Sequence, residues 1–318
     1  MQLEEFLQCE YAELLHPRDL ELSRKALSLS IDAAFATTQC LMGKGGTVLQ
    51  ADAHHLMQII MLRSVTILQV AKGAGHHNII SPQVSLNLTQ DPASAWGLVR
   101  SQFESVAVLG NLFSQHSREE QCFLHTLWVI AGLRTRQRLR GAMSDPRISA
   151  RLPTGILQKA DEELKIIDDL IEKLRSSPLF LGLTPKKQKE VDGAIEDCKY
   201  QFVFEGGVPR YAGWTSLFRR MVSSGAYDDI YPYLCSWGHP SYLSVLQFRG
   251  MFSDGQHIQA VQTATTFAAQ LLAIALHEQM HIAPECINSF ELLPEPCRFL
   301  LTFWNSALRT PTPARIHN

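Results

Sequence analysis

A long apolar segment, residues 260–283, constrains the fold more than any other part of the sequence. Polar residues that interrupt it include Gln262, Gln270, His277, Glu278 and His281. These interruptions are typical of a buried core helix and not of a transmembrane span. We expect this helix to cover residues 256–282, with Asp254 as its N-cap and Pro284 ending it.

Helix start and stop signals divide much of the remaining chain into further predicted helices. Thr47 suits an N-cap, and Asp91 is followed by Pro92, a residue favoured in the first helical turn. The clearest amphipathic pattern lies in residues 154–175, where apolar residues recur at a spacing of three and four. A short helix is predicted over residues 3–15, and other predicted helices cover residues 17–42, 47–71, 91–113, 118–142, 185–199 and 294–308.

This pattern predicts an all-α fold, a multi-helix bundle with an N-terminal helical extension. The extension is expected over residues 1–90, the main bundle over 91–308 and a flexible tail over 309–318. No strand ladder or internal repeat is evident, and residues 73–90 and 200–213 are interpreted as connections. The glycine-rich turn at residues 43–46 lacks the preceding strand and the Gly-Lys-Ser/Thr order of a phosphate loop.

The composition indicates a folded cytoplasmic protein. Of its residues 46% are apolar and 19% charged, and the formal net charge of -2 argues against a strongly electrostatic nucleic-acid or membrane binder. Seven scattered cysteines without a Cys-x-x-Cys pair suit reduced thiols. The N-terminal residues are acidic and lack the pattern of a signal peptide.

The stretch from Tyr227 to Ser241, YDDIYPYLCSWGHPS, has the densest set of polar and aromatic side chains. A second group lies on the predicted helix 91–113, where Arg100 and Glu104 are four residues apart and therefore share a face. Their neighbours are apolar, so we expect the pair to be only partly solvated.

Together these residues resemble a bacterial helical family catalogued as domain of unknown function 5677. In that family an Arg…Glu helix and a Ser-x-x-His-Pro/Gly-Ser turn recur, and here Ser236, His239, Pro240 and Ser241 form such a turn. The resemblance covers residues 93–244 and implies an all-helical fold without an established reaction.

The chemistry of these residues permits two interpretations. Ser236 and His239 are three residues apart and can share a helical face, Arg100 can hold an anion, and Glu104 can orient either Arg100 or His239. These four are the predicted catalytic residues. Four aromatic residues are predicted to bind the ligand: Tyr227, Tyr231, Tyr233 and Trp237. The alternative is a hydrogen-bonded network that only ties helices together.

A second candidate site is the sequence His277-Glu278-Gln279-Met280-His281, a literal His-Glu-x-x-His. In zinc peptidases the two histidines bind the metal from one helical face, and the glutamate activates water. Here His277 and His281 would be the ligands and Glu278 the base. No third histidine follows in the usual pattern, so the other interpretation is structural or surface histidines.

Basic residues provide a third candidate. Arg118 and His125, with six residues between them, are similar to the Arg…His motif of HEPN-type helical ribonucleases, which cleave RNA without a metal. Further along lie Arg134, Arg136, Arg138 and Arg140, followed by Arg147 and Arg151. This run suits a solvated helix end, or else a site for an anion or an RNA phosphate.

These observations predict a bacterial ligand-binding or regulatory protein, with phage defence or stress response as its setting. The alternatives are a metal-independent HEPN-like ribonuclease and a zinc-dependent hydrolase. The expected partner is a small ligand or RNA and not a membrane. No cofactor is expected for the ligand-binding or regulatory protein, whereas zinc is expected for the hydrolase. The apolar face of residues 156–174 suits either the protein's own core or a homodimer contact.

Overall fold

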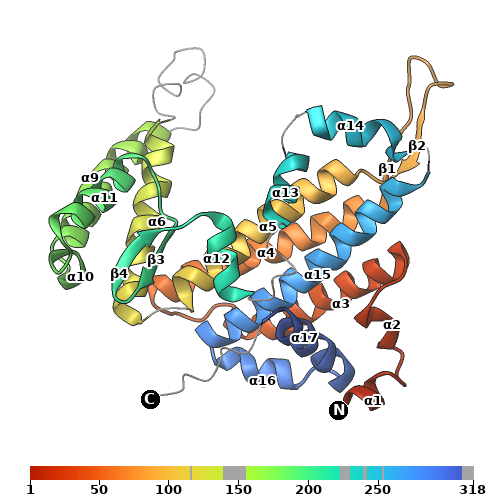
Figure 1. Cartoon of the computed structure of the whole chain (residues 1–318), viewed down its shortest axis with the longest axis horizontal. Coiled ribbons are helices and arrows are strands. Elements are labelled where there is room, and N and C mark those ends of the chain that lie inside the picture. Colours follow the sequence, from red (N-terminus) through yellow and green to blue (C-terminus); the bar gives the residue numbers. More distant parts are fainter. Residues whose placement is uncertain (115–116, 139–154, 223–229, 239–241, 253, 310–318) are drawn as a thin grey trace. The chain divides into compact units, whose positions relative to one another are not determined.

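The computed structural model describes residues 1–114, 117–138, 155–222, 230–238, 242–252 and 254–309. Fifteen α-helices, one 3-10 helix and two small hairpins make up the regular structure of these residues, so the predicted all-α class is confirmed (Figure 1). The chain divides into two compact units. The first contains Met1–Ser114 and Trp214–Asn318, and the second contains Gln115–Gly213.

Four long helices form the centre of the first unit: α3 (Leu20–Thr38), α4 (Val48–Lys72), α5 (Pro92–Phe113) and α15 (Gln256–Ile282). They lie side by side, with α15 against each of the other three (Figure 1). Side chains of α15 from Leu271 to Leu276 are at most 1% exposed. By length and composition α15 is the one helix in the described part of the chain that could cross a membrane, but it is mostly buried, like the core helix of a soluble protein.

The N-terminal helices contribute to this core instead of extending from it. Ala26 and Leu27 of α3 and Met57 and Ile60 of α4 are fully buried, because their apolar faces pack on α15 and α5. Residues 1–90 and 91–308 therefore do not separate as an extension and a bundle, as the sequence analysis had expected. The unit that does separate is an insertion between α5 and α12 (Trp214–Met221).

Local capping explains where several helices begin. The side chains of Thr47 and Asp91 accept hydrogen bonds from backbone N–H groups in the first turns of α4 and α5, as predicted. Asp254 is not the N-cap of α15. Gly255 occupies that position with φ of 68°, a left-handed conformation that glycine adopts without strain.

Shorter helices surround the first unit. α12 and α13 pack on α5, and Gly110 of α5 allows the close approach of α12, because a Cβ there would lie 2.3 Å from Met221 Sδ. α16 and α17 pack against α3 and α15. The remaining bounds are α1 (Leu3–Phe6), α2 (Ala12–Leu15), η1 (Gln39–Leu41), α13 (Ile230–Gly238), α14 (Tyr242–Met251), α16 (Glu285–Glu291) and α17 (Glu295–Leu308).

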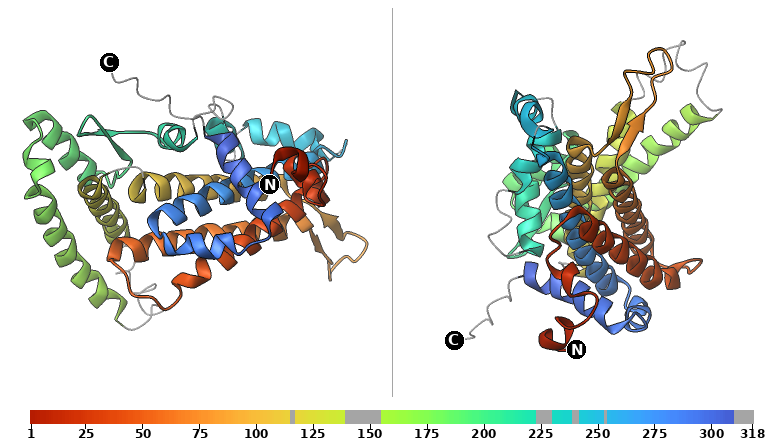
Figure 2. Two further views of the ribbon diagram at one scale, coloured as in Figure 1. Left: turned by 90° about the horizontal axis from the view of Figure 1, so that it is seen from below. Right: turned by 90° about the vertical axis from the view of Figure 1, so that its right-hand side faces the viewer.

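Two hairpins depart from the prediction that no strands pair. β1 (Ala74–His76) and β2 (Leu86–Thr89) form an arm that stands clear of the long helices of the first unit (Figure 2). In the second unit β3 (Phe202–Glu205) pairs with β4 (Val208–Tyr211). Gly206 and Gly207 join them with φ of 58° and 78°, the conformation of a tight two-residue hairpin turn.

The second unit contains α6 (Arg118–Arg138), α9 (Ile156–Arg175), α10 (Pro178–Leu181) and α11 (Pro185–Glu196). The apolar stripe of α9 faces α6, with Ile167 and Leu174 buried, while Leu164 stays 41% exposed.

The arginines near the end of α6 bind groups of the same unit. Arg134 and Arg136 form ion pairs with Glu196 and Glu163, and Arg138 donates to the Glu196 carbonyl. Arg140, Arg147 and Arg151 lie outside the described residues.

Candidate functional site

Arg100, Glu104 and Tyr231 converge where α13 packs on α5. The Arg100 Nε donates to Glu104 Oε1 at 3.1 Å, and the Tyr231 hydroxyl donates to the same oxygen at 2.9 Å. The Arg100 guanidinium carbon lies 5.6 Å from the centre of the Tyr231 ring, which stacks on Phe103. Burial, together with the neighbouring Glu104 carboxylate, raises the pKa of Tyr231 far above its usual value, so its hydroxyl keeps its proton.

A further arginine that the sequence analysis did not assign to the site lies beside this group. Arg63 of α4 donates to the Ser101 carbonyl at 2.9 Å and also to the Ser105 hydroxyl. Burial lowers the pKa of Arg63, and the nearby charge of Glu104 opposes that shift. We call Arg63, Arg100, Glu104 and Tyr231 the helix-tie cluster, since its hydrogen bonds join α4, α5 and α13.

The other residues predicted for this site are distributed differently. Tyr227 and His239 lie outside the described residues, so the catalytic set that includes His239 stays a prediction. The Ser236 hydroxyl donates to the Tyr233 carbonyl at 2.7 Å, within its own helix. Tyr233 contacts Trp96 edge to face at 5.0 Å and also Trp237, and burial raises its pKa. These aromatic residues pack α13 on α5.

The His-Glu-x-x-His sequence lies on α15, as expected, but its glutamate is engaged elsewhere. Glu278 is fully buried, and its two oxygens accept hydrogen bonds from the Ser114 hydroxyl and the Arg309 guanidinium. The carboxylate is therefore committed to an ion pair within the core and does not face an open site for water activation. Arg309, which was predicted to begin a flexible tail, is anchored by this pair, and residues 310–318 lie outside the described chain.

The two histidines line one cavity of about 470 Å³ between α15, α16 and α17. The His277 Nδ1–H donates to the Ala273 carbonyl at 2.9 Å, and the ring packs on Phe290. Burial lowers the pKa of His277 and favours its neutral form. In the part of the chain that is described, no three His, Cys, Asp or Glu side chains are grouped so that they could hold a metal ion.

Arg118 and His125 both lie on α6, two turns apart. Arg118 lines a small cavity beside α10, and the His125 ring tilts against Trp128 at 5.8 Å.

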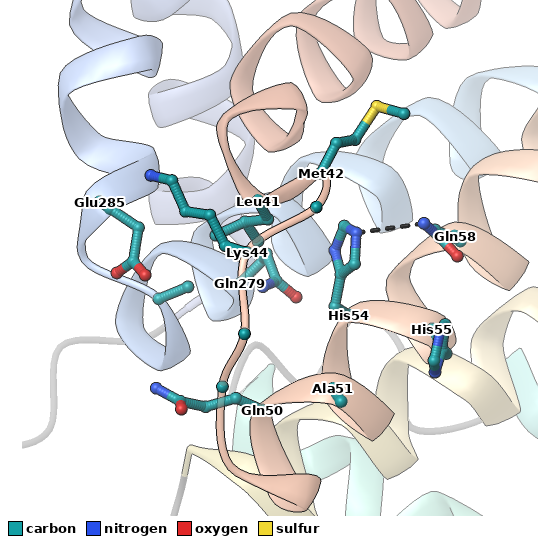
Figure 3. A pocket seen from close by; sticks show the side chains of 14 residues that line it. Leu41, Met42, Lys44, Gln50, Ala51, His54, His55, Gln58, Gln279 and Glu285 are labelled. Atoms are coloured by element: carbon teal, nitrogen blue, oxygen red, sulfur yellow. Dashed lines mark hydrogen bonds between the residues drawn. The ribbon is translucent and has the colours of Figure 1, made fainter.

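The residues that the structure adds are those of a cavity of about 400 Å³ around the glycine turn. Its rim is the loop of residues 42–46, its walls are the first turns of α4 and the start of α16, and its inner end is the C-terminal part of α15 (Figure 3). We call it the glycine-loop pocket. The sequence analysis treated the turn only as a helix end.

Gln279 is the most unusual residue of this pocket. It is 1% exposed, and neither its side-chain oxygen nor its nitrogen has a hydrogen-bond partner. Figure 3 shows its amide behind the glycine loop, between Lys44 and His54. An unpaired buried amide costs about 1–3 kcal/mol, so such groups are rare unless something binds them.

His54 presents a second unpaired group to the same pocket. Its Nε2 lies 3.1 Å from Gln58 Nε2, an amide donor, so His54 Nε2 accepts and the ring proton resides on Nδ1. That Nδ1 is buried without a partner. Burial, and then the neighbouring His55, lower the pKa of His54, which favours the neutral ring.

The rim also carries opposite charges. Lys44 lies in the glycine loop, and Glu285 is the first residue of α16 (Figure 3). The pocket thus combines a buried donor and acceptor at its inner end with a cation and an anion near its mouth. No local sequence pattern reveals this combination, because Gln279 and His54 are 225 positions apart.

Comparisons of the chain with protein-family models, with curated protein sequences and with solved structures each found no match. The likeness to the domain 5677 family therefore rests on the quoted motifs alone, and the geometry of the chain itself must support any proposal on function.

Proposed function

We propose that the protein binds a small polar ligand in the glycine-loop pocket. The observation that carries this proposal is Gln279, whose buried amide lacks a partner for both its donor and its acceptor. A ligand that pairs with both atoms would offset a desolvation cost that the protein alone leaves uncompensated. The helix-tie cluster supports no comparable proposal, because Arg100, Glu104 and Tyr231 already bond to one another and Arg63 donates to Ser101 and Ser105.

The groups in the pocket define the ligand's chemistry. Gln279 pairs with a donor and an acceptor on adjacent atoms, as in a carboxamide or on one edge of a heterocyclic base. The His54 Nδ1–H adds one donor, which suits a second carbonyl or ring-nitrogen acceptor on the ligand. A volume of about 400 Å³ suits a compact metabolite and is near the lower end of the usual range for ligand sites.

The role of such binding is regulatory and not catalytic in this proposal. His54 is held neutral, and Lys44 and Glu285 lie at the rim, so no nucleophile with an adjacent base is present among the described pocket residues. The zinc-hydrolase alternative draws no comparable support, since Glu278 is paired with Arg309.

Thermal unfolding with a panel of compounds tests this proposal. Nicotinamide, uracil and cytosine carry the required edge, whereas benzoate and toluene do not. A compound held at 100 times its dissociation constant stabilises the protein by about 2.7 kcal/mol, which is measurable as a rise in melting temperature. We expect a rise with at least one edge-bearing compound and none with the other two.

The variant Gln279→Leu removes the edge and should abolish that rise. Gln262→Leu is a matched control, because Gln262 lies on the same helix, well over 20 Å along its axis from Gln279, and donates to the Pro17 carbonyl instead. An equal rise in the wild type and in Gln279→Leu, or no rise with any edge-bearing compound, would contradict the proposal.

A further inference from the structure

Two thiols lie against each other behind the rim of the glycine-loop pocket. Cys40 of η1 donates to the Cys286 sulfur of α16 at 3.7 Å, although the residues are 246 positions apart. The Cys40 thiol also lies 3.4 Å from the Thr37 carbonyl and 3.7 Å from the Glu285 carbonyl. All seven cysteines are free thiols, as the sequence analysis predicted, and this is the one pair for which a sulfur–sulfur contact is found.

We propose that Cys40 and Cys286 form a reversible disulfide when the protein meets a peroxide. The sulfur atoms need to approach by less than 2 Å to reach the bond length of about 2.05 Å. Cys40 precedes Leu41 and the glycine loop, and Cys286 follows Glu285, so the new bond would join two sides of the pocket rim.

The two thiols differ in exposure, and this difference determines which of them is oxidised first. Cys40 is partly exposed, whereas Cys286 is fully buried. Burial raises the pKa of Cys286 to about 12, so it stays protonated and does not react with a peroxide itself. Cys40 is therefore the thiol that an oxidant reaches first, and Cys286 is the one that resolves the product.

The reaction balances with hydrogen peroxide as the oxidant. The Cys40 sulfur attacks one peroxide oxygen, the O–O bond breaks, and Cys40 sulfenic acid and one water form. The Cys286 sulfur then attacks the Cys40 sulfur, its proton joins the departing hydroxide, and a second water leaves. Two thiols lose two electrons in total, peroxide gains them, and a dithiol reductant reverses the change.

Intact-protein mass spectrometry of the full chain tests this inference. Treatment with hydrogen peroxide should lower the mass by about 2 Da, and alkylation should then label five cysteines instead of seven. Peptide mapping should recover the peptide of Cys40 linked to that of Cys286, and dithiothreitol should restore both thiols. A monomer band on a non-reducing gel shows that the bond lies within one chain.

Two variants assign the order of events. Cys286→Ser should leave a sulfenic acid on Cys40, which dimedone traps, and Cys40→Ser should abolish the disulfide without trapping at Cys286. Cys122→Ser is the matched control, because Cys122 is exposed and should not affect the mass change. If Cys40 and Cys286 are both still alkylated after treatment, while Cys122 is oxidised, the inference is wrong.

An effect of the disulfide on ligand binding rests on the proposed function. The same peroxide-treated sample, tested with the compound that stabilises the reduced protein, should show a changed rise in melting temperature. The mass measurement does not depend on any ligand, so failure to form the disulfide and failure to bind a compound are separate results.

Discussion

The helix-tie cluster and the glycine-loop pocket both contain buried or partly buried polar side chains of the same unit, but their hydrogen bonds differ. In the helix-tie cluster Glu104 accepts from Arg100 and from Tyr231. In the pocket Gln279 has no partner for either amide atom, and His54 has none for Nδ1. The polar groups of the cluster have hydrogen-bond partners, whereas these groups of the pocket have none.

This difference teaches which polar residues suggest a binding site. The density of polar and aromatic residues drew attention to residues 227–241, yet Tyr233 packs on Trp96 of α5 and the Ser236 hydroxyl bonds within its own helix. An unsatisfied buried group is a stronger indication, because the fold retains it at a cost in free energy.

The ion pair of Glu278 and Arg309 gives a fully buried carboxylate its cation. Arg309→Ala should lower the free energy of unfolding by about 3–5 kcal/mol, because it leaves a buried carboxylate without its cation. Urea unfolding followed by circular dichroism measures this. The double variant Arg309→Leu/Glu278→Leu should recover part of the loss, and a single variant as stable as the wild type would show that the pair is not formed.

Glu104 tests the helix-tie cluster. Glu104→Ala removes the shared acceptor of Arg100 and Tyr231 and should lower the free energy of unfolding by about 1–3 kcal/mol. The loss should lie towards the lower end of this range, because Arg100 and Glu104 are both partly exposed. Glu13→Ala is the control, since Glu13 and Arg18 form an exposed pair worth less than about 1 kcal/mol. Equal melting temperatures of the two variants would count against the cluster's structural role.

Substitution of Gln279 should not lower stability, in contrast to the two substitutions above. Without a ligand, Gln279→Leu should leave stability unchanged or raise it by about 1 kcal/mol, because it removes an unpaired buried amide. Gln102→Leu is the matched comparison, since Gln102 is fully buried and its amide nitrogen, unlike that of Gln279, donates to the Ser64 hydroxyl at 2.8 Å and the Ala268 carbonyl at 3.2 Å, while its oxygen has no partner. That variant should lose about 1–3 kcal/mol. Equal losses in both would contradict the difference between a hydrogen-bonded and an unpaired buried amide.

Acid should slightly lower the free energy of unfolding through His54 of the glycine-loop pocket. The folded pKa of His54 is lowered, so the unfolded chain takes up a proton first as the pH falls below about 6.5. The stabilising contribution of neutral His54 is therefore complete above that pH and is lost as the pH falls towards the folded pKa. In urea unfolding, the free energy of unfolding should fall less between pH 7.5 and pH 5.5 for His54→Gln than for the wild type. The control His76→Gln, at an exposed position, should match the wild type.

The sequence predicted those parts of the fold that depend on local signals. Thr47 and Asp91 cap helices because a hydroxyl or carboxylate a few residues away satisfies a backbone N–H, whatever the rest of the chain does. The core helix α15 was predicted from its apolar run. The strands β3 and β4 were missed because Phe202, Val203 and Phe204 are all buried and show no alternation, although Gly206-Gly207 is a hairpin signal.

The site depended on long-range contacts, which no local pattern contains. Arg100 and Glu104 share a face by their spacing, and Tyr231 was among the expected binding residues, so part of the helix-tie cluster was predictable. The engagement of Glu278 was not, because its partners Ser114 and Arg309 are distant in sequence. The pocket likewise forms only when α15 meets the start of α4.

The most direct test of the account is the side-chain amide signal of Gln279 in nuclear magnetic resonance spectra of ¹⁵N-labelled protein, assigned by its disappearance in Gln279→Leu. Titration with nicotinamide, uracil or cytosine is predicted to shift this signal saturably with at least one compound, while the Gln102 amide, already bonded to Ser64 and Ala268, stays in place. A Gln279 signal that none of the three compounds moves would contradict the central claim that this amide awaits a ligand.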